Sequence, residues 1–174
     1  GMLTEALGHA VAGGAGERAG DLLELALPDL RQSRQDRVLR RWLRALPEDV
    51  LRDRPGLGIS TAWVHLSEGD LDGVETWLDR AAAALPHTPA GQRQELTAMS
   101  EIYRAAVAQA RGDVAGTVGH AGMALQLAGE GDHRTRAAAS GFLGLAAWAS
   151  GDLGVAGATF GDAGRLAPAE RVLH

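Results

Sequence analysis

Few residues in this 174-residue chain have the type and spacing that catalysis or metal binding requires. Its six histidines are scattered, and none forms the His-x-x-x-His or His-Glu-x-x-His spacing that places two ligands on one helix face. Cysteine is absent and all 17 basic residues are arginine, which excludes thiolate chemistry, a Schiff-base lysine and a phosphate-loop lysine. We therefore expect a non-enzymatic chain with no catalytic residues, no metal site and no cofactor.

Two short motifs resemble sites of known chemistry but lie in the wrong context. Residues 58–62 (Gly-Ile-Ser-Thr-Ala) resemble a nucleophile elbow, which places a serine on a sharp turn between a strand and a helix. The surrounding pattern puts them inside a helix instead. Residues 129–132 (Gly-Glu-Gly-Asp) resemble a glycine-rich loop, but no strand is predicted before them, so we interpret them as a connection between helices. His65 is expected to have a structural role.

A Gly-Asp pair recurs at residues 69–70, 112–113 and 151–152, with spacings of 43 and 39 residues. Small or apolar residues recur at fixed offsets from its glycine: Ala62, Ala105 and Gly144 seven residues before it, and Leu78, Ala121 and Phe160 nine residues after it. A helix–turn–helix unit repeated at this length is typical of a solenoid. We expect the glycine to end one helix in a left-handed conformation and the aspartate to cap the next.

The pattern predicts an all-α fold without a sheet, an α-α superhelix of about four to five helix pairs in a single domain covering residues 2–174. Its parts are a weak pair at 3–30 built on Gly14, linker helices at 34–53, and clear repeats at 56–86, 91–129 and 134–168. Within the repeats, helices are expected at 56–68, 71–84, 91–111, 114–128, 134–150 and 153–166. Ser33 and Asp36 should cap the first linker helix, and Pro47 should separate it from the second.

The repeats resemble the tetratricopeptide repeat, and residues 39–85 have a narrower resemblance to the helical-repeat region of the MalT-like, large ATP-binding regulators of the LuxR family. The narrower resemblance rests on Trp42, Leu46-Pro47-Glu48, Arg54-Pro55 and Ala62-Trp63, which occur in this order. In that family the region lies between a nucleotide-binding module and a C-terminal helix-turn-helix. The resemblance implies a bacterial transcription regulator's sensor domain that binds a small-molecule inducer or a partner protein. The alternative is a stand-alone tetratricopeptide scaffold or adaptor for protein–protein interaction.

Two surfaces are candidates for binding. The first is a groove on the concave side of the array, lined by the first helix of each pair, with the predicted residues Ile59, Trp63, Leu66, Met99, Ile102, Gln109, Leu145 and Trp148. The second is a basic face that would dock an acidic partner, with the residues Arg37, Arg40, Arg41 and Arg44. Each has an ordinary alternative, because tryptophans often pack in a core and arginines often form a solvated helix face with ion pairs.

Charge and hydropathy narrow the choice of partners. The net charge of −5 argues against direct nucleic-acid binding by this chain. No apolar run reaches the roughly 18 residues of a membrane span, and no signal peptide is visible, so we expect a cytoplasmic protein without membrane contact. Homo-oligomer formation stays open, because residues 138–166 end the array without an obvious polar cap.

Overall fold

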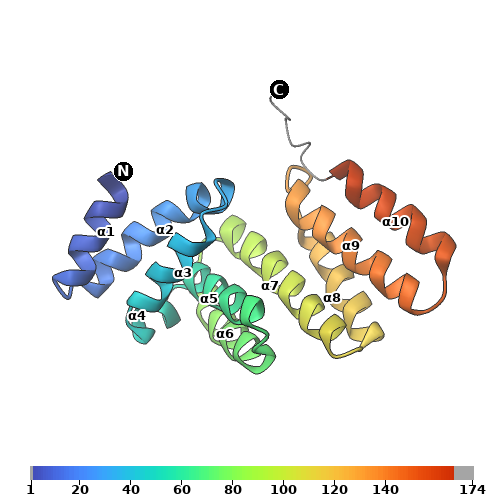
Figure 1. Ribbon diagram of the computed structural model, residues 1–174, viewed down its shortest axis with the longest axis horizontal. Coiled ribbons are helices and arrows are strands. Elements are labelled where there is room, and N and C mark those ends of the chain that lie inside the picture. The colour runs from blue at the N-terminus through green and yellow to red at the C-terminus, as the bar shows by residue number, and fades with distance from the viewer. Residues whose placement is uncertain (1, 167–174) are drawn as a thin grey trace. The chain divides into compact units, whose positions relative to one another are not determined.

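The computed structural model describes the backbone of residues 2–166 and the side chains in this range except those of residues 2–4, 162, 163 and 166. Every regular element in the described range is helical, which confirms the predicted all-α class. The chain divides into two compact units, one up to Thr88 and the other from Pro89 (Figure 1). The six repeat helices begin and end within one residue of the predicted positions.

The N-terminal unit contains two helix pairs, with two short helices between them along the chain. Its described elements are α1 (Met2–Ala12), α2 (Gly16–Gln32), α3 (Asp36–Ala45), α4 (Glu48–Arg52), α5 (Pro55–Glu68), α6 (Leu71–Ala84) and the 3₁₀ turn η1 (Leu85–His87). Helices α5 and α6 pack together, α4 contacts both, and α2 and α3 pack against α5. Fully or almost fully buried leucines from four of these helices form the core, namely Leu23, Leu39, Leu57 and Leu78. Packing of this kind stabilises helices too short to persist alone.

The C-terminal unit consists of two helix pairs. They are α7 (Ala90–Ala110) with α8 (Val114–Leu127), and α9 (His133–Ala149) with α10 (Leu153–Leu166). Helix α9 also packs against both α7 and α8, so one pair is layered on the other. The core is built mainly of fully buried alanines, namely Ala98, Ala105, Ala121, Ala124, Ala139 and Ala146. Side chains this small let neighbouring helix axes approach closely.

The Gly-Asp turns have the predicted geometry. Gly69, Gly112 and Gly151 have φ values of 78°, 75° and 81°, which is the left-handed region. The following aspartates cap the next helix, and each Oδ1 accepts a hydrogen bond from the backbone N–H three residues later at 3.0, 2.8 and 3.0 Å. The weaker N-terminal copy has the same left-handed glycine, Gly14, but Ala15 follows it and gives no side-chain cap.

The predicted cap of the first linker helix is wrong. Helix α3 begins at Asp36 after Gln35, which makes no side-chain cap, and the Ser33 hydroxyl instead donates to the Asp29 carbonyl at 2.6 Å. The reason is a turn of the Gly-Asp type that lacks a glycine. Arg34 has φ 51°, and the Gln35 N–H donates to the Leu30 carbonyl at 2.9 Å, as Asp70 N–H does to His65.

Two glycine substitutions in one helix pair should have opposite effects. Gly112→Ala should lower the free energy of unfolding by roughly 1–2 kcal/mol, because alanine resists the left-handed conformation. Gly119→Ala is the matched control, since Gly119 lies inside α8 with open space around its position, and it should raise stability by roughly 0.5–1 kcal/mol. Urea unfolding of both variants tests this; equal effects would contradict the left-handed turn at Gly112.

The turn at Arg34 allows the opposite substitution, in which glycine replaces a residue that has a positive φ. Arg34→Gly should stabilise the chain by up to about 1 kcal/mol, because glycine adopts the observed positive φ without strain. Arg37→Gly, in the first turn of α3, should instead lose roughly 0.5–1 kcal/mol through helix propensity. Thermal or urea unfolding measures both, and destabilisation by Arg34→Gly would show that the turn is not strained.

Candidate functional site

Two of the four predicted basic-face arginines are held by α5. The Arg40 guanidinium lies over the Trp63 ring, 5.7 Å from its centroid, and its Nη2 donates to Ser67 Oγ at 3.1 Å. Arg44 forms an ion pair with Glu68. A cation on an aromatic face, together with two polar contacts, links α3 to the outer part of α5. Arg40 and Arg44 therefore stabilise the packing of α3 on α5 in addition to contributing charge to the surface.

The other two arginines are directed to solvent. Arg37 and Arg41 are exposed and lie one helical turn apart on α3. The Arg41 guanidinium lies over the Trp42 ring, 5.1 Å from its centroid, and the Arg37 side chain makes no hydrogen bond or ion pair with any described residue. The basic face that a partner can reach is thus narrower than predicted and is centred on these two side chains.

The predicted groove residues of the N-terminal unit differ in their exposure to solvent. Trp63 and Leu66 are partly exposed, but Ile59 is completely buried, so its assignment to a ligand groove is wrong. Helices α2, α3 and α4 pack against α5, and Arg31 Nη2 donates to Ser60 Oγ at 2.8 Å beside Ile59. Alignment with the other repeats missed this burial, because they have no linker helices covering the first helix of the pair.

The predicted groove residues of the C-terminal unit are all accessible to some degree. Met99, Ile102 and Gln109 are half-buried on α7, and Leu145 and Trp148 are exposed on α9. No described arginine lies over Trp148, whereas Trp42, Trp63 and Trp77 each carry one. A single groove shared by Trp63 and Trp148 stays a prediction, since the two residues belong to different units.

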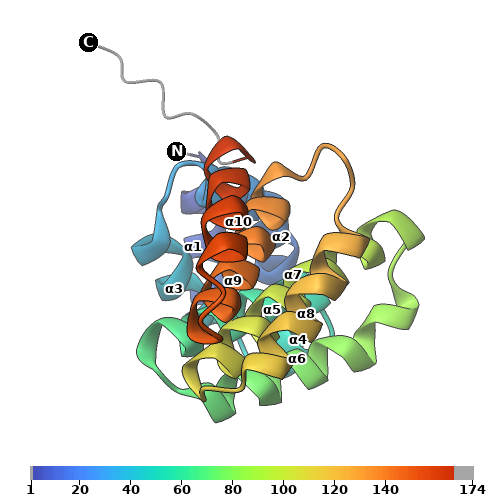
Figure 2. The same ribbon diagram turned by 90° about the vertical axis from the view of Figure 1, so that its right-hand side faces the viewer.

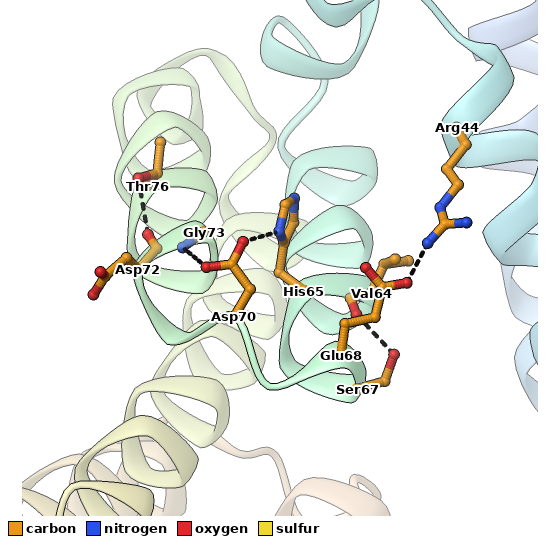
Figure 3. A network of polar contacts seen from close by, with 9 residues as sticks. All are labelled: Arg44, Val64, His65, Ser67, Glu68, Asp70, Asp72, Gly73 and Thr76. Carbon is orange, nitrogen blue, oxygen red and sulfur yellow. Dashed lines mark hydrogen bonds and ion pairs between the residues drawn. The ribbon is translucent and has the colours of Figure 1, made fainter.

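A polar network holds the C-terminal turn of α5 on two sides (Figure 3). On one side Glu68 pairs with Arg44 of α3. On the other, His65 Nδ1 lies 2.8 Å from Asp70 Oδ2, while Asp70 Oδ1 accepts from the Gly73 N–H. A β-carbon at residue 73 would collide with both Asp70 and His65, so this close arrangement requires glycine.

The network lowers the pKa of Asp70. The hydrogen bond from the Gly73 N–H is the largest cause, and the His65 contact adds to it. Both favour the charged carboxylate over the protonated form. His65 therefore has the structural role expected of it, as a partner of the capping residue.

The motifs that resembled catalytic sites have structural contacts. Ser60 is buried within α5, and its hydroxyl donates to the Gly56 carbonyl at 2.7 Å, so it does not lie on a nucleophile elbow. Residues 129–132 connect α8 to α9, and Asp132 caps α9 by accepting from the Thr135 N–H at 3.0 Å. Among the described residues no group of three or more His, Asp or Glu side chains is placed to hold a metal ion.

The same connection lines a hollow in the C-terminal unit, with a volume of about 490 Å³. Its lining residues are Gly91, Gln94, Glu95, Leu127, Gly129, Gly131 and Asp132. Gln94 Nε2 donates to the Leu127 carbonyl across it at 2.9 Å, and Asp132 is already committed to capping α9. None of the predicted groove residues lines this hollow, and it has no aromatic side chain to receive an apolar ligand.

The Arg40–Trp63 contact is the feature that sequence reasoning missed. The two residues are far apart along the chain, and no spacing pattern in the sequence pairs them. In contrast, Arg41 and Trp42 are adjacent in sequence, which offers at least a local hint of their contact. None of the described helices is long and apolar enough to cross a lipid bilayer.

The chain matches no family model, no curated protein and no solved structure. A function can therefore be inferred only from its residues and their geometry.

The polar network makes a prediction about acid titration. The Asp70 carboxyl should titrate below the ordinary aspartate pKa of about 3.9, and His65→Ala should move its pKa part of the way back, because the Gly73 N–H remains. Since the folded pKa is the lower one, the stability from Asp70 is complete above the unfolded pKa and is lost as pH falls through the folded pKa. Carboxyl-carbon NMR measures the midpoints.

Circular dichroism is the control for this titration, and His65→Ala should keep the helicity of the parent chain. An Asp70 midpoint that His65→Ala does not move would contradict the contact.

Proposed function

We propose that this chain is a tetratricopeptide-like helical-repeat domain that binds a protein partner, as the sensor region of a MalT-like, LuxR-family regulator. The observation that carries the proposal is one turn repeated three times, a left-handed glycine followed by an aspartate that caps the next helix. Units that share such a turn stack into an α-α superhelix whose extended surface is used for binding. The MalT-like assignment itself rests on the sequence resemblance of residues 39–85.

The N-terminal unit offers the more specific surface for a partner. Arg37 and Arg41 are exposed on α3, and Trp63 and Leu66 are partly exposed on α5, against which α3 packs. Residues 31–54 contain eight arginines and four acids, in a chain whose net charge is −5. A local positive field of this kind steers an acidic partner and sets its orientation. We infer that the partner presents an acidic helix with some apolar side chains.

A protein partner is favoured over a small-molecule inducer. The hollow of about 490 Å³ in the C-terminal unit is large enough for a small ligand, but glycines and acidic side chains dominate its lining. Small-molecule sites are usually enclosed by apolar and aromatic side chains. The second candidate function, a stand-alone scaffold or adaptor, uses the same surface and differs only in what accompanies this domain.

A pair of synthetic peptides tests the proposed surface. The first is an amphipathic helix with glutamates on its polar face and leucines on its apolar face, and the second has lysine in place of each glutamate. Titration calorimetry should detect binding of the acidic peptide only, with weaker binding at high salt because screening removes the attraction. Arg37→Glu with Arg41→Glu should weaken binding by at least about tenfold, which corresponds to about 1.4 kcal/mol.

Arg134→Glu is the matched control for the double variant. Arg134 is also an exposed arginine, but it lies on α9 in the other unit. This variant should bind the acidic peptide as the parent chain does, and circular dichroism should show equal helicity for all three proteins. Equal binding of both peptides, or binding that survives the double reversal, would overturn the proposed surface.

A further inference from the structure

The C-terminal unit has large apolar side chains exposed on its last helix pair. Leu145 and Trp148 of α9 are 36% and 63% exposed, and Leu153 and Phe160 of α10 are 68% and 40% exposed. Scattered apolar side chains are normal on a protein surface, but a contiguous group of large ones marks an interaction site. These four side chains therefore mark an interaction site only if they share one face of the unit.

Helix geometry places them together. Leu145 and Trp148 are three residues apart on α9, and Leu153 and Phe160 are seven apart on α10, so each pair shares a side of its helix. The Phe160 ring packs directly on Gly144, where a β-carbon would lie 2.8 Å from a ring carbon. Gly144 lies four residues before Trp148, on the same side of α9, and α9 and α10 lie side by side (Figure 2). We name these four residues the end face.

The preceding helix pair, α7 and α8, shows how the corresponding residues are covered when another pair follows. In the repeat alignment Phe160 corresponds to Ala121 of α8, which is completely buried. The residues aligned with the other three are half-buried in the pair on which α9 packs, namely Ala106, Gln109 and Val114. The equivalents of the end face are thus more covered where a further helix pair follows, and within the described residues no further helix covers the end face.

We propose that a second copy of this chain covers the end face, related by a two-fold axis that sets the α9–α10 pair against the same pair of the partner. A two-fold interface brings one surface against itself, so that surface must contain both projections and hollows. Trp148 and Phe160 supply the projections. The low positions beside them are Gly141, Gly157 and Gly164, which lie on the same sides of α9 and α10, have no side chain and have open space around them.

The lack of charged side chains on the end face favours a second copy of the same face over a charged partner. Residues 137–151 contain no charged side chain, and neither do residues 153–161. Two copies can therefore approach through this face without placing the net charge of −5 on each chain at the contact. An acidic or basic partner would gain no ion pair there and would leave its own charges desolvated. The proposal does not rest on the proposed function, since it concerns other residues in the other unit.

Sedimentation velocity between about 1 and 100 µM tests the proposal on the full chain. The parent should shift with concentration from a mass of 18.1 kDa toward twice that value. Trp148→Glu should raise the dimer dissociation constant at least tenfold, because the two-fold axis brings two new carboxylates into the same apolar contact. Gly157→Leu should weaken the dimer too, because it adds a large side chain at a low position of this face, where it meets no atom of its own chain.

Leu25→Glu is the matched control. Leu25 is also a large, exposed apolar residue, at 71% exposure, but it lies on α2 in the N-terminal unit. This variant should dimerise as the parent does, and each variant should keep the parent's helicity by circular dichroism. A parent that stays monomeric at 100 µM would overturn the proposal. So would a dimer that persists unchanged in Trp148→Glu.

Discussion

The left-handed helix end is the constraint on which the rest of this structure depends. At residues 14, 34, 69, 112 and 151 the chain adopts a positive φ. In each case the next N–H donates to the carbonyl five residues earlier, at 2.9–3.0 Å. This bond reverses the chain within two or three residues and sets consecutive helices side by side. Helices of 14 residues, such as α5, α6, α8 and α10, are marginal alone, so the turns bring together the faces that stabilise them.

The two units use different side chains within this common framework. The N-terminal unit is filled with leucines and ties its helices by arginines. Arg54 reaches Glu17 and Asp21 of α2 at 2.8 and 2.6 Å, and although burial opposes it, hydrogen bonding raises the pKa of Arg54, so it stays charged. The C-terminal unit is filled with alanines, which let its helices pack closely. Two of its large apolar side chains, Trp148 and Phe160, remain accessible.

Features fixed by nearby residues could be predicted from the sequence, and features fixed by distant ones could not. The glycine turns and their aspartate caps depend on residues within one helical turn, so their geometry was predictable. The turn at Arg34 was hidden, because tertiary packing imposes a conformation for which arginine carries no preference. Ile59 was misassigned for a similar reason, since linker helices that the other repeats lack cover it. The Arg40–Trp63 contact joins residues from separate helices and has no local pattern.

The two candidate surfaces differ in the force that each uses, and this makes them separable in one molecule. The surface around Arg37 and Arg41 attracts through charge, which salt screens over about 8–10 Å at ordinary ionic strength. The end face on α9 and α10 has no charge to screen, and salts excluded from protein surfaces strengthen rather than weaken apolar burial. Raising the salt concentration should therefore release an acidic partner while preserving a dimer. A chain built in this way can keep its own assembly constant while its contact with a partner responds to ionic conditions.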